Sequence, residues 1–166
     1  MKYKAVLFDL DGTLLDTIED LANSVNSVLT HHGYPIHSLG EYKFLVGNGL
    51  RNLIIKALPT DERSEANTDK CLDELREEYG KRWAEKTKPY PGVPELLDGL
   101  TAKGIKMAIL SNKADNFTKQ IIATLLPDWK FEAVYGERPS VPKKPDPTAA
   151  LDIARSLGIS PSEFLY

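Results

Sequence analysis

The sequence predicts an α/β protein whose core is a Rossmann-like parallel sheet, with an α-helical domain inserted into it. Three observations predict this fold class. An apolar run near the N-terminus ends in two carboxylates and a glycine turn, a long segment with helical periodicity follows, and strand and helix patterns then alternate to the last residue. Because parallel strands need crossover connections, this alternation is typical of a parallel sheet covered by helices.

Length and composition fit a soluble protein with one large domain or two small ones. The chain has 166 residues, of which 42% are hydrophobic and 27% are charged. Its net charge of −3 and the lack of a basic cluster argue against a nucleic-acid partner. The first apolar run is too short for a signal peptide, no run could span a membrane, and the single cysteine, Cys71, allows no internal disulfide. We therefore expect a cytoplasmic protein with neither a nucleic-acid nor a membrane partner.

The first expected element is a buried strand from Lys4 to Phe8, which ends in a pair of acids. Asp9 and Asp11 are two residues apart, so a strand places both on one side, at the carboxyl end where open α/β sheets build their sites. Close like charges need a cation between them or a shared proton. One carboxylate can then attack phosphorus, the other can move a proton, and Mg²⁺ can neutralise the pair. The alternative is an ordinary polar turn, in which Asp and Gly are common.

The next segment, residues 17–88, is expected to form an inserted helical domain. Pro59 ends one of its helices, and no strand pattern interrupts the segment. Its apolar residues recur at helical spacing, among them Ile18, Leu21, Val25, Val28, Leu29, Leu72, Leu75, Tyr79 and Trp83. The histidines of this segment, His31, His32 and His37, are expected to be surface residues and not ligands, and the sequence shows no evident partner for them.

Strand and helix patterns alternate from residue 89 onward. The expected strands lie at 105–110 and 131–135, and a further strand opens at 164–166. Helices are expected around apolar residues at helical spacing, namely Val93, Leu96, Leu97, Leu100, Phe117, Ile121, Ile122, Leu125, Ala150, Ile153, Ala154 and Leu157. Residues 1–16 and 89–166 are therefore expected to form the Rossmann-like core.

Two polar strings follow the later strands at the same edge of the expected sheet. Ser111 and Asn112 come after the second core strand, where hydroxyl, amide and helix-start N–H groups can bind a phosphate, although either residue could be an ordinary helix N-cap. Lys144, which precedes Pro145, can neutralise a phosphate and a nearby carboxylate, although its loop could be a solvated basic turn. Lys143 is the second candidate for this role.

These strings resemble three signature motifs of the haloacid dehalogenase-type phosphatase superfamily. The first motif, D-x-D-G-T-[LV]-x-D-[TS], is matched without departure from Asp9 to Thr17. A [ST]-N strand end at residues 111–112 and a K-P-x-P loop at residues 144–147 follow in the order of the family. The resemblance covers nearly the whole chain and identifies Lys144 as the family lysine.

The resemblance implies a Mg²⁺-dependent phosphatase that acts on a small phosphorylated metabolite. Asp9 would be the nucleophile that forms an aspartyl-phosphate, and Asp11 would protonate the leaving group and then activate water. Mg²⁺ would bind the Asp9 carboxylate and the Asp11 main-chain carbonyl. Ser111 would hold phosphate oxygens, and Lys144 would neutralise charge on the phosphoryl group and on Asp9.

The resemblance also implies substrate-binding residues. Asn112 would hold a phosphate oxygen, and Thr13 would order the loop of the first motif. The inserted helices match the helical-cap subclass, whose cap closes over the site and reads the leaving group. The loop at residues 46–51 resembles the cap loop of family members that hydrolyse 2-phosphoglycolate, in which Gly47 would allow close backbone approach. Arg51 would pair with the substrate carboxylate or remain solvated. The best candidate substrate is therefore 2-phosphoglycolate.

One part of the family pattern is missing. The fourth motif places acidic residues after the next strand, commonly in a V-G-D-[ST]-x-x-D string, whereas this sequence ends at Phe164-Leu165-Tyr166. The chain therefore resembles a family member shortened at its C-terminus, with an incomplete sheet and an incomplete metal site. Without a neighbour, the first strand would expose unpaired backbone groups, so we expect instability or self-association through that sheet edge.

Other functions remain open at this point. A sugar phosphomutase would share the same helical cap, although Thr13 favours a phosphatase. A dehalogenase is disfavoured because such relatives lack the second acid, which is Asp11 in this chain. Without the fourth motif, the chain could instead be a catalytically impaired fragment or a non-catalytic phosphate-binding protein.

Overall fold

The computed structural model describes residues 2–166 and divides the chain into two compact units. The first unit runs from the N-terminal strand to Leu15 and resumes at Pro89, and the second unit comprises Asp16–Lys88. The sequence places the first boundary one residue later and the second boundary at the same position. Within residues 2–166, no helix combines the length and the hydropathy that a membrane crossing requires.

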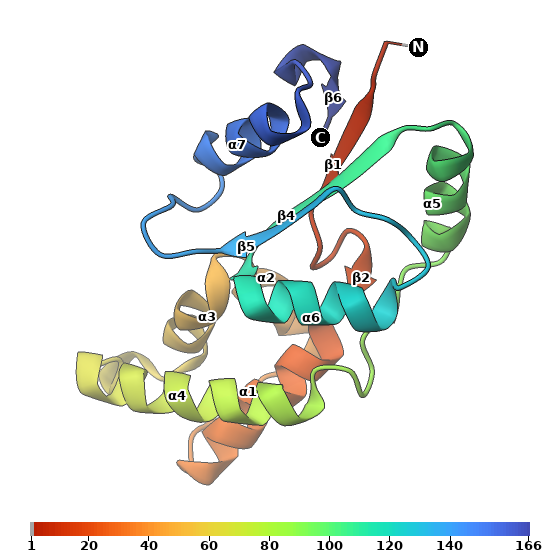
Figure 1. The fold of residues 1–166 in the computed structure, drawn as a ribbon. Helices are drawn as coiled ribbons and strands as arrows, with labels where there is room; N and C mark the ends of the chain where they lie inside the picture. Colours follow the sequence, from red (N-terminus) through yellow and green to blue (C-terminus); the bar gives the residue numbers. More distant parts are fainter. Residues whose placement is uncertain (1) are drawn as a thin grey trace. The chain divides into compact units, whose positions relative to one another are not determined.

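The first unit is built on a four-stranded parallel sheet, which confirms the predicted fold class (Figure 1). Its strands, in the order β5-β4-β1-β6, are β5 (Ala133–Glu137), β4 (Lys106–Ala114), β1 (Ala5–Phe8) and β6 (Phe164–Leu165). All residues of β1 are buried, as expected for an apolar run inside a parallel sheet. β1 pairs with β4 along its length and with β6 at Ala5 and Val6. The residue after Phe8 therefore lies at the carboxyl end of a strand with neighbours on both sides.

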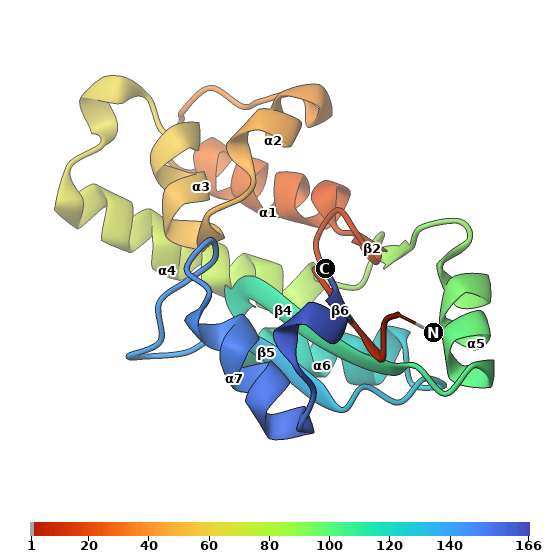
Figure 2. The same ribbon diagram turned by 90° about the horizontal axis from the view of Figure 1, so that it is seen from above.

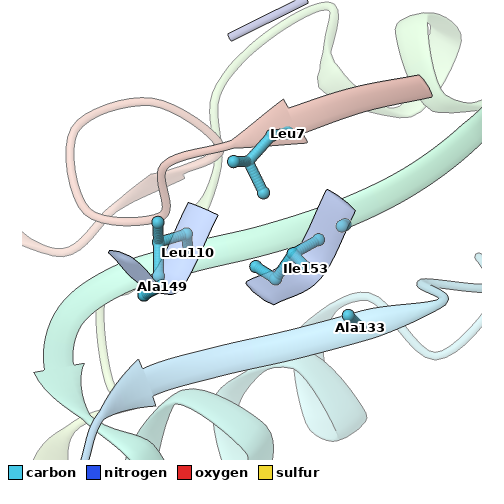
Figure 3. Close-up of a cluster of buried hydrophobic side chains, with 6 residues drawn as sticks. Leu7, Leu110, Ala133, Ala149 and Ile153 are labelled. Atoms are coloured by element: carbon cyan, nitrogen blue, oxygen red, sulfur yellow. The ribbon is translucent and has the colours of Figure 1, made fainter. Parts of the chain in front are cut away.

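Helices cover both faces of this sheet. They are α5 (Val93–Ala102), α6 (Asp115–Leu125) and α7 (Thr148–Leu157), and a 3₁₀ turn lies at Pro161–Glu163. α6 packs against β4 and β5 on one face, and α7 lies on the opposite face (Figure 1). There α7 and the strands form a buried apolar cluster (Figure 3), which comprises Leu7, Ala108, Leu110, Ala133, Ala149 and Ile153. This packing holds the strand ends in place, as a site at those ends requires.

β4 extends further than the sequence predicts. The expected strand ends at Leu110, but β4 continues to Ala114, with an irregularity in its pairing to β5 between these two residues. The polar side chains of the added residues hide this continuation, because they lack the apolar pattern of a buried strand. α6 begins at Asp115 with Ala114 at the N-cap position. The alternative that Ser111 or Asn112 caps this helix is therefore wrong.

The second unit is a group of four helices connected by short turns (Figure 2). They are α1 (Ile18–His31), α2 (Leu39–Leu45), α3 (Gly49–Ala57) and α4 (Glu65–Arg82), with a 3₁₀ turn at Thr60–Glu62. The short paired strands β2 (Leu15–Asp16) and β3 (Lys88–Pro89) each contain one of the two boundaries between the units. α1 and α3 pack against α4, and α2 packs against α1 and α3. The buried residues of this interior include Leu21, Val25, Leu29, Tyr42, Ile54, Leu75 and Tyr79. Most of them lie at the helical spacing that the sequence shows.

A buried carboxylate joins the two ends of the second unit. Asp20 of α1 is fully buried. Its oxygens accept hydrogen bonds from the Lys86 N–H at 3.0 Å, the Thr87 N–H at 2.8 Å and the Thr87 hydroxyl at 2.7 Å. A buried charge is tolerated when donors satisfy it in this way. Asp20 therefore ties the start of α1 to the segment that precedes β3.

Candidate functional site

The loop after β1 is held by a buried leucine and leaves its two acids partly exposed. Leu10 is fully buried, and its carbonyl oxygen accepts hydrogen bonds from the N–H groups of residues 13–15 at 3.0–3.2 Å. Gly12 has a φ of +78°, in the left-handed region that favours glycine. This tight turn keeps Asp9 and Asp11 at the strand end, with side chains that are 40% and 20% exposed.

Asp9 is paired with the lysine that the family resemblance identifies. The Nζ atom of Lys144 lies 2.7 Å from Oδ1 of Asp9 and donates a hydrogen bond to the Leu110 carbonyl oxygen at 2.8 Å. The Leu10 N–H also donates to Oδ1 of Asp9, at 2.7 Å. Because Leu110 belongs to β4 and Asp9 follows β1, the lysine joins the ends of two neighbouring strands. A carboxylate with an adjacent ammonium group is suited to nucleophilic attack on an anionic phosphate.

Asn112 positions the main chain of this lysine. The Asn112 side-chain amide donates from Nδ2 to the Lys144 carbonyl oxygen at 3.1 Å, and its Oδ1 accepts from the Lys144 N–H at 2.9 Å. The peptide bond between Lys144 and Pro145 is cis. Both polar atoms of Asn112 are therefore engaged with the lysine loop, which connects the loop to the end of β4.

The structure distinguishes the two lysine candidates. Lys143 is paired with Glu137, and its Nζ lies 2.8 Å from the Glu137 Oε1 atom. Lys144 instead reaches Asp9, as described above. Thr13, which the resemblance places in the substrate-binding set, is exposed, and its N–H donates to the Leu10 carbonyl oxygen at 3.2 Å. This contact is consistent with a role in ordering the loop.

Asp11 is paired with a second lysine, Lys113, that the sequence motifs do not identify. The Nζ atom of Lys113 lies 2.9 Å from Oδ1 of Asp11. The Ser111 hydroxyl lies 3.5 Å from Oδ2 of Asp11 and accepts a hydrogen bond from the Lys113 N–H at 3.1 Å. The sequence contains one signal for this lysine, namely its place directly after the Ser-Asn string. Its partner, however, follows a different strand and could not be read from the local pattern.

The irregular end of β4 depends on a glycine of β5. A Cβ atom at Gly136 would lie 2.5 Å from both the Lys113 carbonyl oxygen and the Asp115 Cα atom. The Gly136 N–H donates to Oδ1 of Asp115 at 2.9 Å. Burial raises the pKa of Asp115, but hydrogen bonds from Lys119 and from the Gly136 N–H outweigh it and hold the pKa below its ordinary value. Close backbone contact at Gly136 thus shapes the segment that carries Ser111 and Lys113.

The oxygen donors at these strand ends fit Mg²⁺. Both contacts of Asp9 given above use Oδ1, so Oδ2 is available to a cation. Mg²⁺ prefers oxygen ligands, keeps several waters and is typically held by one or two protein carboxylates together with substrate phosphate. Among residues 2–166, no third His, Cys, Asp or Glu side chain joins Asp9 and Asp11 in a cluster of metal-site size. The two acids therefore supply a partial but chemically suitable set of ligands.

The second unit carries the other two expected substrate-binding residues. Gly47 has a φ of +150° and lies just before α3, and a Cβ atom built there would meet no atom within 4 Å. Arg51 of α3 forms an exposed ion pair with Asp69 of α4. The hydrogen bond and the charge of Asp69 raise the pKa of Arg51 above its ordinary value. Within its own unit, Arg51 therefore has Asp69 as a carboxylate partner.

The histidines of the second unit have partners that are not evident from the sequence. His31 Nδ1 and His32 Nε2 lie 3.1 and 2.9 Å from Glu74 Oε2, and His37 Nε2 lies 2.8 Å from the Ala57 carbonyl oxygen. Burial raises the pKa of Glu74, but the hydrogen bonds from the two histidines lower it by more, so that the pKa lies below its ordinary value. These partners lie on other helices, and no local signal in the sequence indicates them. The contacts connect the C-terminal end of α1 to α4.

Known proteins match this chain in sequence over nearly its whole length. Residues 6–166 match the sequence profile of a family described as haloacid dehalogenase-like hydrolases. A phosphoglycolate phosphatase from Pseudomonas savastanoi pv. phaseolicola is 35% identical over 170 residues, which cover 98% of this chain and 61% of that protein. A phosphoglycolate phosphatase from Aquifex aeolicus is 33% identical over 166 residues, which cover 98% of this chain and 74% of that protein.

Solved structures share the fold. A crystal structure from Lactobacillus delbrueckii subsp. bulgaricus, of a protein proposed to be a phosphoglycolate phosphatase, superimposes with a TM-score of 0.92 at 26% sequence identity. The match covers 100% of this chain and 78% of that one. The chain spans 61% of the length of the Pseudomonas relatives that it matches. These matches confirm the resemblance that the three sequence motifs predict.

Proposed function

Because the chain belongs to the haloacid dehalogenase-like hydrolase family, we propose that it hydrolyses a small phosphate monoester through an aspartyl-phosphate on Asp9. The observation that carries this proposal is the pairing of Asp9 with Lys144, whose Nζ lies 2.7 Å from the carboxylate at the end of β1. The preferred substrate in this proposal is 2-phosphoglycolate, because the relatives from Pseudomonas and Aquifex are named phosphoglycolate phosphatases. Residues 17–88 would be the cap domain that selects this substrate.

In the first proposed step, a carboxylate oxygen of Asp9 attacks the phosphorus atom. A bond forms between that oxygen and phosphorus while the bond from phosphorus to the leaving oxygen breaks. Asp11, in its protonated form, gives its proton to the leaving oxygen, so that an alcohol departs instead of an alkoxide. Lys144 faces the attacking carboxylate and offsets the negative charge of the phosphoryl group.

In the second proposed step, water releases the phosphate. Asp11, now a carboxylate, accepts a proton from a water molecule whose oxygen attacks phosphorus. The bond between phosphorus and the Asp9 oxygen breaks, which regenerates the Asp9 carboxylate and yields inorganic phosphate. The Ser111 hydroxyl lies beside Asp11 and can donate to a phosphoryl oxygen. Asn112 acts in this scheme through the main chain of Lys144, to which its amide is bonded.

A divalent cation completes the proposed site. The Asp9 carboxylate and the Asp11 main-chain carbonyl would hold Mg²⁺, with water and substrate phosphate as further ligands. When bound, Mg²⁺ supplies positive charge to the phosphoryl oxygens and offsets the repulsion between substrate and carboxylates. The ammonium groups of Lys144 and Lys113 supply further positive charge, because they lie beside Asp9 and Asp11.

The test is the release of inorganic phosphate from 2-phosphoglycolate by this chain, with and without Mg²⁺. We expect release that requires Mg²⁺ and falls at least about 10³-fold in Asp9→Asn, because the nucleophile is lost. The matched control is Asp61→Asn, which changes an exposed aspartate of the second unit and should leave the rate unchanged. Intact-protein mass spectrometry after acid quench should detect a phosphate adduct that Asp9→Asn lacks.

Three outcomes would contradict the proposal. Unchanged release by Asp9→Asn would remove Asp9 as the nucleophile. No release from any phosphate monoester would overturn the hydrolase assignment for this chain. Release from sugar phosphates but not from 2-phosphoglycolate would keep the reaction class and overturn the substrate.

A further inference from the structure

The two lysines of the site differ in burial and in partner. Lys144 faces Asp9 and is 15% exposed, whereas Lys113 faces Asp11 and is 7% exposed. A lysine side chain this deeply buried is uncommon without a compensating carboxylate, because removing the ammonium group from water is costly. Lys113 is therefore placed for its contact with Asp11 and not for solubility.

The main chain at Lys113 is held from two directions. Its N–H donates to the Ser111 hydroxyl at 3.1 Å. Its carbonyl oxygen is so close to Gly136 that a Cβ atom there would lie 2.5 Å away. Because the backbone is fixed on both sides, the direction in which the lysine side chain leaves β4 is fixed as well.

This arrangement orients the carboxylate of Asp11. Lys113 holds Oδ1 at 2.9 Å, and the Ser111 hydroxyl lies 3.5 Å from Oδ2. Without these contacts, the Asp11 carboxylate would populate several rotamers, and only some of them suit proton transfer. Proton transfer requires the acid to lie within hydrogen-bond reach of the reacting oxygen. The orientation of the carboxyl group therefore matters before its pKa does.

We propose that Lys113 is a positioning residue that orients the Asp11 carboxylate for proton transfer to the leaving oxygen. The inference rests on the proposed phosphatase function and assigns different roles to the two lysines of the site. Lys144 acts on the nucleophile and the phosphoryl group, whereas Lys113 acts through the acid. Loss of Lys113 should therefore slow the reactions that need a proton on the leaving group and spare those that do not.

The test compares two substrates that differ in this need. 2-Phosphoglycolate has an alkoxide leaving group that must be protonated, whereas p-nitrophenyl phosphate releases a stable phenolate. The rate of phosphoryl transfer to Asp9 is measured in a single turnover, so that the later attack by water does not enter. We expect Lys113→Met to slow transfer from 2-phosphoglycolate about 10²-fold, the size of a general-acid contribution. Transfer from p-nitrophenyl phosphate should change less than about threefold, since it bypasses the acid.

Three further variants separate positioning from general damage. Lys113→Arg keeps the charge and should recover most of the loss with 2-phosphoglycolate. In an Asp11→Asn background, Lys113→Met should cause no further loss, because a residue that acts through another has nothing left to position. The matched control is Lys130→Met, which removes an exposed lysine paired with Glu132 at 2.9 Å and should change neither rate. If Lys113→Met does not fold, Lys113→Gln, whose amide ends one bond short of the ammonium position and carries no charge, provides the same comparison.

The outcomes separate this inference from the proposed function. Equal losses with both substrates, or additive losses in the Asp11→Asn background, would overturn the positioning role while leaving Asp9 as the nucleophile. No loss with either substrate would overturn it as well. If the unmodified chain forms no phosphate adduct with either substrate, the proposed function fails and the role of Lys113 fails with it.

Discussion

The two units of the molecule use aspartate in different ways. In the first unit, Asp9 and Asp11 are partly exposed at a strand end, and each faces one lysine side chain. In the second unit, Asp20 is fully buried and accepts its hydrogen bonds from the main chain of Lys86 and from both donors of Thr87. The buried carboxylate of Asp20 supports the fold, whereas Asp9, whose two contacts both use Oδ1, keeps Oδ2 for the proposed chemistry. Burial and the type of donor thus distinguish the proposed nucleophile from a structural acid.

The largest expected effect comes from removing the cation of the reactive pair. Lys144→Met should lower kcat/KM for phosphate release about 10³-fold, because the charge that offsets the phosphoryl group is lost. The unfolding temperature should change little, since Asp9 is 40% exposed and water can solvate it once the lysine is gone. Steady-state kinetics and thermal unfolding of the same preparation measure the two effects.

The neighbouring lysine provides the control for that experiment. Lys143→Met removes a lysine paired with Glu137 and should leave kcat/KM within about twofold. If Lys144→Met retained more than half of the activity, the pair with Asp9 would be only a surface contact. The proposed difference between Asp9 and the structural Asp20 would then be wrong.

The second largest effect is expected at Gly136, which lies against the main chain of Lys113 and Asp115 at the end of β4. Gly136→Ala places a Cβ atom 2.5 Å from the Lys113 carbonyl oxygen and the Asp115 Cα atom. Because both contacts are with backbone, we expect a loss of about 3 kcal/mol in the free energy of unfolding, as for an overpacked core position. Urea unfolding followed by circular dichroism measures the loss.

Another glycine of the same unit makes a matched comparison. Gly99 lies inside α5, and a Cβ atom there would meet no atom within 4 Å. Gly99→Ala should therefore stabilise the protein by about 0.5–1 kcal/mol, the difference in helix propensity. Equal effects at Gly99 and Gly136 would mean that the end of β4 is not held by close approach to β5.

These residues mark the limit of what the sequence alone can predict. The structure of the run Ala5–Phe8 follows from its own apolar residues, and the run forms the buried strand that we expect from them. The extension of β4 past Leu110 is different, because it depends on a glycine of another strand. No property of residues 111–114 themselves signals that approach.

The same distinction applies to the candidate site. Asp9, Asp11 and Lys144 stand in motif strings that can be recognised without a structure, and the geometry brings Asp9 and Lys144 together. Lys113 follows one of those strings, but its role depends on a partner beyond another strand. The contact between His32 and Glu74 shows this limit in the second unit, since His32 follows α1 and Glu74 lies on α4. Long-range pairing of charges is therefore the information that local patterns lack.

The third prediction tests the structural aspartate. Asp20→Asn keeps one oxygen that can accept from Thr87, but it removes the charge and places an NH₂ donor where the Lys86 N–H donates at 3.0 Å. We expect a loss of about 2 kcal/mol in the free energy of unfolding, because two donors then face each other in a buried site and the remaining hydrogen bonds are no longer charge-assisted. Amide hydrogen exchange at Lys86 and Thr87 should quicken in step, and exchange along β1 should quicken less.

An exposed aspartate of the same unit is the control for Asp20. Asp73 pairs with Arg76 three residues further along α4, and both side chains are largely exposed. Asp73→Asn should leave stability and exchange nearly unchanged, as is usual for exposed ion pairs. If Asp20→Asn were equally harmless, the second unit would not rely on buried carboxylates, and the contrast between the units would reduce to exposure alone.

The smallest expected effect tests whether Arg51 of the second unit binds the substrate. If Arg51 binds the carboxylate of the proposed substrate, Arg51→Gln should raise KM for 2-phosphoglycolate about tenfold, because one charge-assisted hydrogen bond is lost. Ethyl phosphate carries a methyl group in place of that carboxylate, so its KM should not change. Asp69→Asn breaks the same ion pair from the other side and leaves the arginine in place. It should therefore leave KM for 2-phosphoglycolate unchanged or lower it. If Arg51→Gln and Asp69→Asn instead raise both KM values equally, the pair supports α3 and α4, and the specificity for a carboxylate must come from another residue.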